Sequence, residues 1–280
     1  MCQSFRVNNT EDSTVDSGQW RDLNRAWWDE RAPIHEASVF YRSGGGGLEG
    51  FEWDDLGPVD GLDVIHPQCH IGSDTISLAE RGARVVGLDF SAAAIDGARR
   101  LADQAGVSDR SEWVTSDVYD AVDAVGGSTF DLVYTGKGAL CWLPDMDAWA
   151  AVMWQLCRPG GRLYVSEFHP LSDTMAWETT LFERSYFASE GHCYDDADGS
   201  YADPDAATEN NSVVDFIQPL STVVQALIDL GFQLQLMREF PITVFRRWPF
   251  LVEQETGVWH MPDDRAQIPL MYSLRFLRPS

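Results

Sequence analysis

The residues best suited to chemistry lie in the loop HPQCHIGSDT, at residues 66–75, and at the acid that follows it. His66, Cys69 and His70 are residue types that bind zinc, but no matching pair stands elsewhere in the chain. Asp89 closes the β-branched run at residues 84–88. A carboxylate at the end of such a strand can accept hydrogen bonds from both hydroxyls of a ribose. We therefore predict a ligand-binding loop with Asp89 beside it.

Residues 63–89 must position this loop, and they are typical of a strand, a tight loop, a helix and a second strand. Val64 and Ile65 form a short apolar run, and Ile76 and Ala79 have helical spacing. Gly82 is suited to the left-handed position after a helix end. The segment predicts one βαβ unit, whose two strands are parallel and joined by a right-handed crossover.

The rest of the chain continues this alternation of strands and helices. A turn is expected at Pro159-Gly160-Gly161. Further strands are predicted at 112–115, 130–134, 162–168, 232–240 and 271–277, and helices at 92–105, 145–157 and 219–230. This order predicts an α/β fold with a Rossmann-like, doubly wound and mostly parallel sheet of seven strands, whose last two strands are an antiparallel pair.

Two segments do not fit the alternation and predict additions to this domain. Residues 1–18 are polar, and residues 19–41 contain tryptophans at helical spacing up to Pro33, which we expect to end the helix. That helix either packs on the domain or covers a ligand as a cap. Residues 171–218 are rich in aromatics and predict a partly β lid. We divide the chain into a tail and cap at 1–50 and a main domain at 51–280.

Composition excludes several classes of function. The chain has 280 residues, with 20 Lys and Arg against 44 Asp and Glu, a formal net charge of −24. Such a charge disfavours nucleic acids and anionic membranes as partners. We find no apolar segment of membrane-spanning length and no signal-peptide core, so we expect a cytoplasmic protein, either monomer or homodimer. The acidic turn at 195–205 has Tyr194 at the first calcium-ligand position, and no metal is expected.

Four features in order resemble class I S-adenosylmethionine-dependent methyltransferases. They are the loop HPQCHIGSDT, GLDFS ending the second strand, SDVYD after the third, and LCRPGGRLYVSEFHP around the fifth. The loop narrows the resemblance to a bacterial small-molecule subgroup with QCHxGxDT. One departure concerns the usual acid at the end of the first strand, since His66 stands there. A nicotinamide oxidoreductase would require GxGxxG, which is absent.

The resemblance implies S-adenosyl-L-methionine as cofactor and S-adenosyl-L-homocysteine as product. Asp89 would hold the ribose, Asp117 the adenine amino group, and Arg31 or Tyr41 the methionine carboxylate. The alternatives are a helix N-cap for Asp117 and a surface ion pair for Arg31. The implied cofactor-binding residues are Trp28, Arg31, Tyr41, Gln68, His70, Gly72, Asp89, Phe90, Ser91, Asp117, Val118, Thr135 and Gly136.

The expected reaction is an in-line displacement at the sulfonium methyl, for which alignment supplies most of the effect. His169, after the fifth strand, is the candidate general base, and the alternative is that it caps the strand through a backbone hydrogen bond. The candidate acceptor-binding residues are His35, Trp142, Tyr186 and Trp248. We predict methyl transfer to a small aromatic or apolar metabolite, with secondary metabolism suggested by analogy. The alternative is a non-catalytic member of the fold that binds a cofactor or partner.

Overall fold

A computed structural model describes residues 19–42, 46–188, 190–255 and 257–280. The predicted N-terminal tail at 1–18 lies outside the described residues, as does part of the glycine-rich segment after the cap. Among the described residues, no helix combines the length and the apolar character that crossing a membrane requires.

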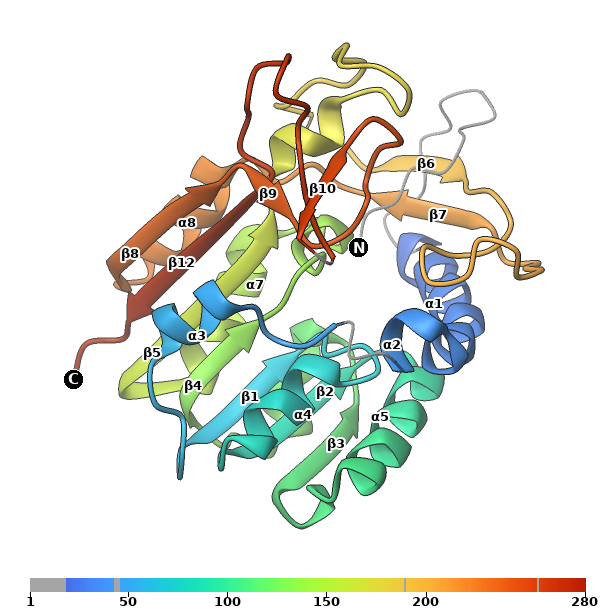
Figure 1. Cartoon of the computed structure of the whole chain (residues 1–280). Coiled ribbons are helices and arrows are strands. Elements are labelled where there is room, and N and C mark those ends of the chain that lie inside the picture. The colour runs from blue at the N-terminus through green and yellow to red at the C-terminus, as the bar shows by residue number, and fades with distance from the viewer. Residues whose placement is uncertain (1–18, 43–45, 189, 256) are drawn as a thin grey trace.

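The predicted seven-stranded sheet is confirmed, with the order β3-β2-β1-β4-β5-β12-β8 (Figure 1). The strands β1 to β5 are parallel, and β12 runs antiparallel to both of its neighbours. The bounds are β1 Asp63–Pro67, β2 Arg84–Asp89, β3 Ser111–Thr115, β4 Phe130–Thr135, β5 Cys157–Phe168, β8 Gln233–Phe240 and β12 Met271–Leu277.

Helices cover both faces of the sheet, as the doubly wound prediction requires. One apolar core, which includes Trp149 and Phe276, lies under α7 Met146–Leu156 and α8 Leu220–Asp229. The other core, which includes Trp113, lies under helices on the opposite face. Those helices are α3 Gly50–Leu56, α4 Ser73–Glu80 and α5 Ala92–Ala105. Burial on both faces explains the continuous apolar runs of the central strands.

The N-terminal cap is a longer helix than the sequence predicted. Helix α1 spans Gln19–Ala37 and contains Pro33, so the expectation that this proline ends the helix was wrong. A proline removes one intrahelical hydrogen bond. Arg31, Ala32 and His35 are buried on either side of it, and this packing keeps the last turn helical. The short helix α2, Val39–Arg42, follows.

The predicted lid contains β6 His192–Asp195 and β7 Ser212–Asp215, which form an antiparallel pair. A second addition was not predicted, because residues 245–261 read as an aromatic loop. Two of its segments instead form a small sheet with β9 Ile242–Thr243, namely β10 Val252–Glu255 and β11 Val258–His260. Figure 1 shows both additions beyond the carboxyl ends of the parallel strands.

The expected turn at Pro159-Gly160-Gly161 was also wrong, because it lies inside β5. Cys157 pairs with Phe130 and Arg162 pairs with Leu132, so five residues of β5 advance opposite two of β4. The three residues therefore form an irregularity in the strand, where the left-handed φ of +78° at Gly160 suits a glycine.

Candidate functional site

A cavity lies at the carboxyl ends of β1, β2 and β4. It encloses about 980 Å³ free of atoms, a volume that includes open space at its mouth. The strand order changes direction between β1 and β4, where open α/β sheets bind ligands. The predicted residues that line it are Trp28, Tyr41, Gln68, His70, Asp89, Phe90, Asp117, Val118, Gly136 and Trp142.

The loop between β1 and α4 has an unusual backbone. Gln68 and His70 have left-handed φ angles of 59° and 54°, and Gly72 has 77°. A side chain in this conformation costs about 1–2 kcal/mol. Both side chains make contacts that offset this cost, since Gln68 Nε2 donates to the Ala139 carbonyl at 2.9 Å and His70 Nε2 lies 2.9 Å from His35 Nδ1. The second contact joins the loop to the cap.

Asp89 occupies the predicted position on the cavity wall. Its Oδ2 accepts a hydrogen bond from His70 N at 2.8 Å, and its Oδ1 accepts one from Ser91 N at 2.9 Å. Burial nevertheless raises the pKa of this carboxyl to about 6. The carboxylate is thus oriented by the backbone of the loop, and its remaining lone pairs can accept ligand hydroxyls.

Asp117 lines the cavity, and it also caps a short 3₁₀ helix, which is the alternative that the sequence left open. Its Oδ1 accepts a hydrogen bond from Tyr119 N at 3.0 Å, at the start of a 3₁₀ turn. Its Oδ2 lies 2.7 Å from Arg21 Nε of the cap. The helix cap fixes the carboxylate while the cavity remains in reach.

Glu167 at the end of β5 anchors another part of the wall. Its carboxylate accepts the backbone N–H groups of Gly138, Ala139 and Leu140, with 2.8 Å to Ala139 N and 3.0 Å to Leu140 N. Burial raises the pKa of this carboxyl. Both oxygens are occupied, so Glu167 shapes the loop after β4.

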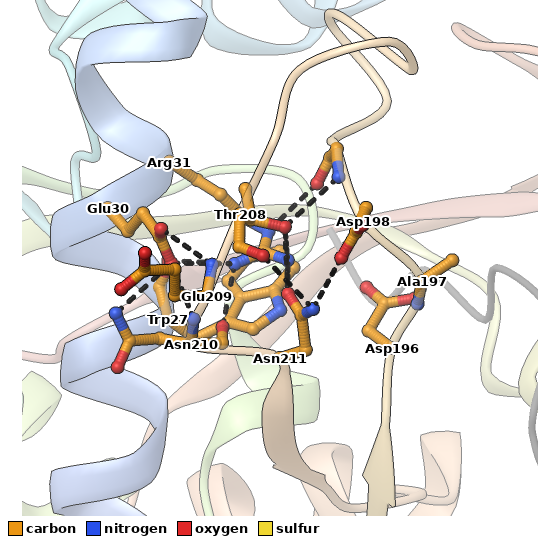
Figure 2. Close-up of polar contacts among 11 residues, drawn as sticks. Trp27, Glu30, Arg31, Asp196, Ala197, Asp198, Thr208, Glu209, Asn210 and Asn211 are labelled. Carbon is orange, nitrogen blue, oxygen red and sulfur yellow. Dashed lines mark hydrogen bonds and ion pairs between the residues drawn. The ribbon is translucent and has the colours of Figure 1, made fainter.

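Arg31 is not in the cavity, and this corrects its predicted role. Its side chain is fully buried against the lid, where Nε donates to the Gly199 carbonyl at 3.1 Å and Nη1 to the Asn210 carbonyl at 2.9 Å. Nη2 donates to Asn211 Oδ1 at 2.8 Å (Figure 2). A buried guanidinium needs such acceptors, and Glu30 Oε2 also lies 3.9 Å from Nη1, so Arg31 binds the lid instead of a ligand.

His169 does not line the cavity either, which argues against a general base. Its Nδ1 accepts the Leu171 N–H at 3.1 Å, and its Nε2 lies 3.0 Å from Glu239 Oε1. The alternative role, a backbone cap, is the one observed. The sequence located the residue at the end of β5 but could not show which way its ring turns.

The remaining predicted residues that do not line the cavity lie behind its wall or in the packing around it. Gly72 and Ser91 occupy the N-cap positions of α4 and α5. Thr135 is fully buried, and His35 is buried beside His70. Two predicted acceptor-binding residues are structural instead, since Tyr186 accepts the Leu220 N–H through its hydroxyl and Trp248 stacks on Phe250. These placements correct their predicted roles.

Several cavity residues were not predicted. Asp74 and His66 belong to the loop motif and could have been found there, whereas Tyr201 in the lid has no local signal. Its hydroxyl bonds to that of Tyr41 across the cavity mouth. The unpredicted lining residues are Trp20, Asn24, Gly46, His66, Cys69, Ser73, Asp74, Lys137, Gly138, Ala139, Leu143 and Tyr201.

A second, smaller cavity of about 310 Å³ adjoins the first, and Gly138 lines both. Phe168, Phe216 and Tyr272 contribute aromatic walls. Arg247 is 7% exposed and pairs with Asp173 through Nη2, while its Nη1 is buried without a hydrogen-bond partner among the described residues. The cavity therefore combines an aromatic lining with one unused donor.

Known proteins that resemble this chain share its fold. Residues 67–163 match the family model described as a methyltransferase domain. The CcbJ methyltransferase of Streptomyces caelestis superposes with a TM-score of 0.62 at 14% identity, over 91% of this chain and 98% of that one. An S-adenosylmethionine-dependent methyltransferase of Mesorhizobium loti gives 0.56 at 22% identity, over 81% and 97%. The chain has the methyltransferase fold.

Two curated relatives match about a third of this chain. The release factor glutamine methyltransferase of Chlorobaculum tepidum is 41% identical over 91 residues, 32% of this chain and 29% of the relative. The tRNA 5-carboxymethoxyuridine methyltransferase of Escherichia coli is 33% identical over 92 residues, 33% and 34%. The chain thus spans about a third of these relatives. The matches support the predicted enzyme class and S-adenosylmethionine as cofactor, and they do not identify the acceptor.

Proposed function

We propose that this protein transfers a methyl group from S-adenosylmethionine to a small molecule. The observation that carries the proposal is the cavity at the switch point of a methyltransferase fold, with Asp89 and Asp117 on its wall. Asp89 would accept the ribose hydroxyls, and Asp117 the adenine amino group. Trp28, Phe90 and Trp142 line the same cavity and supply apolar surfaces for a planar base.

The second cavity is the proposed site of the methyl acceptor. It shares Gly138 with the first cavity, so a molecule there would lie beside the cofactor. Its aromatic walls favour an aromatic or apolar body. Arg247 Nη1 would be satisfied by one oxygen of the acceptor, and Asp173 already balances the guanidinium charge. A neutral oxygen therefore fits better than a second carboxylate.

A small acceptor agrees with the charge of the chain. The net charge of −24 disfavours a tRNA substrate, although one relative carries tRNA in its name. No residue is assigned as general base, because His169 faces elsewhere. Catalysis then depends on holding acceptor, methyl carbon and sulfur in line.

Calorimetric titration with S-adenosylhomocysteine tests the proposal. We expect binding at micromolar concentration or tighter, and a loss of about 100-fold or more in Asp89→Ala, because two hydrogen bonds to a charged group disappear. Asp96→Ala is the matched control, since Asp96 is exposed and pairs with Arg99 on the surface of α5. This control should bind like the unaltered protein.

The acceptor search then uses a labelled methyl donor and a panel of phenolic and other aromatic metabolites. Transfer of label to one of them, abolished by Asp89→Ala, would support the full proposal. Tight binding of S-adenosylhomocysteine without any transfer would favour a non-catalytic member of the fold. The absence of both heat and thermal stabilisation at millimolar ligand would refute the cofactor itself.

A further inference from the structure

A cluster of charged side chains lies at the end of the first cavity beside Gly136, away from Asp117. Lys137 Nζ lies 2.8 Å from Glu52 Oε2 and 3.6 Å from Asp74 Oδ2. The Tyr134 hydroxyl donates to Glu52 Oε1 at 2.9 Å and lies 3.2 Å from Asp74 Oδ2. Asp74 and Lys137 both line the cavity.

The charges of this cluster do not balance. Glu52 and Asp74 carry two negative charges and Lys137 one positive charge, and the side chains of Glu52 and Lys137 are only 0% and 6% exposed. Asp74 Oδ1 is buried without a hydrogen-bond partner among the described residues. Buried charges in proteins are normally paired. The cluster therefore has a net negative charge that one more cation would balance.

His66 provides a second unused polar atom at the same place. Its Nδ1 lies 2.8 Å from Thr75 Oγ1, and its Nε2 is buried without a partner in the described part of the chain. Burial lowers the pKa of this imidazole to about 3, so the ring is neutral. A neutral ring that donates through Nδ1 presents a lone pair at Nε2.

Asp74 and His66 both lie beside Gly136, and the Asp74 oxygen nearest to it is Oδ2, which already has the Tyr134 hydroxyl and Lys137 as neighbours. A Cβ added to that glycine would lie 2.9 Å from Asp74 Oδ2 and 3.0 Å from His66 Nε2. Glycine therefore keeps open a small polar recess between the end of β4 and the start of α4. A group that enters this recess meets one carboxylate and, in the tautomer of His66 that donates through Nδ1 to Thr75, one imidazole lone pair, and both are hydrogen-bond acceptors.

We propose that Asp74 and His66 together bind the α-ammonium group of the cofactor's methionine part. This inference rests on the proposed function, and it assigns to these two residues the task of the acid that is missing from the end of β1. Asp74 lies in the first turn of α4, after the loop, whereas the usual acid would lie at the end of β1, before the loop. The negative charge would therefore come from the other end of the loop. Lys137 and Tyr134 orient its carboxylate.

Calorimetry with three ligands tests this assignment. The ligands are S-adenosylhomocysteine, its analogue with hydrogen in place of the amino group, and 5′-methylthioadenosine, which lacks the amino acid part. We expect Asp74→Asn to weaken S-adenosylhomocysteine about 10- to 100-fold, as for loss of a charge-assisted hydrogen bond. Binding of 5′-methylthioadenosine should change by no more than about twofold, since it does not reach the recess.

The unaltered protein should prefer S-adenosylhomocysteine over the desamino analogue by a similar factor, and Asp74→Asn should lose this preference. Asp96→Asn is the control, and it should behave like the unaltered protein. Gly136→Ala is a second variant that does not depend on removing a charge. The backbone of Gly136 lies outside the left-handed region, so an alanine can adopt the same conformation. The added methyl group should block the recess.

The outcomes separate this inference from the proposed function. If S-adenosylhomocysteine does not bind to the unaltered protein, both fail. If it binds equally well to Asp74→Asn and the unaltered protein, the assignment of Asp74 is wrong and the proposed function stands. An equal loss of affinity for all three ligands in Asp74→Asn and in Gly136→Ala would also overturn the assignment, because it would indicate general damage to the cavity.

Discussion

The cofactor cavity has two sides that are built in different ways. The sheet side consists of the loop after β1, Asp89, Asp117 and Gly136, which the backbone of the parallel sheet holds in place. The cap side consists of α1 and the lid, whose contacts join residues 168 to 190 positions apart in the sequence. There, side chains of α1 bind backbone groups of the lid. The first side is a local motif, and the second is a tertiary assembly.

This difference indicates which side of the cavity can change without affecting the other. Asn24 exchanges two hydrogen bonds of 2.8 Å with the backbone of Val214, and Glu30 accepts the N–H groups of Glu209 at 2.8 Å and Asn210 at 2.7 Å. Glu30 and Arg31 bind the lid through polar contacts (Figure 2), beside an apolar cluster in which Trp27 and Trp28 accompany Tyr194 and Val213 of the lid. A different lid could therefore be attached without altering Asp89 or the loop.

Arg31→Met is the substitution that we expect to destabilise the cap side most. The variant removes a buried guanidinium and leaves the Gly199 and Asn210 carbonyls without their donor. We expect a loss of about 3 kcal/mol in the free energy of unfolding, since several hydrogen bonds to a charged group are lost. Urea denaturation measures this loss. Arg110→Met, on an exposed arginine, should change it by less than about 0.5 kcal/mol.

Limited proteolysis then locates the damage in Arg31→Met. Cleavage within residues 196–211 should become faster while the sheet stays protected, because only the cap side has lost its contacts. Uniform cleavage over the whole chain would contradict the separation of the two sides.

On the sheet side, the affinity for S-adenosylhomocysteine should depend on pH. Burial raises the pKa of Asp89 to about 6, and ribose hydroxyls bind its ionised form. Ligand binding therefore lowers this pKa, and affinity falls as pH decreases through 6. We expect a loss of about tenfold between pH 7.5 and pH 5 from this carboxyl alone, since each pH unit below the pKa costs a factor of ten.

Two controls accompany the pH series. Asp74 also has a pKa raised to about 6, by burial, so Asp74→Asn isolates the contribution of Asp89. Conversely, Asp89→Asn should bind weakly and with a smaller pH dependence. In the free protein the sign is opposite, because a raised carboxyl pKa means that stability from Asp89 decreases as pH rises through about 6. An affinity that rises on acidification would refute the assignment.

His169→Ala distinguishes the base that the sequence suggested from the cap that the structure shows. Loss of the cap to Leu171 and of the contact with Glu239 should cost about 1 kcal/mol of unfolding free energy. The affinity for S-adenosylhomocysteine should stay within about twofold. Once an acceptor is identified, the methyl-transfer rate should also stay within about threefold. A drop of a hundredfold or more would restore the catalytic role.

His70→Gly is expected to have the smallest effect, and it acts where the two sides meet. Glycine would remove a left-handed side chain, which gains about 1 kcal/mol. It would also remove the contact with His35 Nδ1, a hydrogen bond of similar value. Thermal unfolding should therefore shift by no more than a few degrees. A large destabilisation would mean that this contact holds the cap to the sheet.

Much of the sheet side could be predicted from the sequence because its signals are local. Apolar runs such as Val64-Ile65 located the strands, and the helix expected at 92–105 is α5, with Ser91 and Gly106 at its caps. Asp89 was placed correctly because a residue that closes β2 must lie at the carboxyl edge of the sheet. The same reasoning placed His169 at the end of β5, but strand position alone did not determine its partners.

The cap side could not be predicted in the same way. Arg31 was assigned either to the cofactor or to a surface ion pair, and its acceptors in the lid include backbone carbonyl groups, which any residue could provide. Tyr201 reaches the cavity from a lid without a recognisable motif. Pro33 was expected to end α1, and the buried residues around it decide otherwise.

The sequence by itself determined the alternating strands and helices, the mostly parallel sheet of seven strands, and the position of Asp89 at the carboxyl edge. These depend on residue patterns within one βαβ unit, where the backbone leaves few alternatives. Only the tertiary structure decided that Arg31 binds the lid, that His169 turns away, and that Asp74 and His66 meet beside Gly136. Those contacts join separate elements through side-chain orientation and shared burial, which no local pattern records.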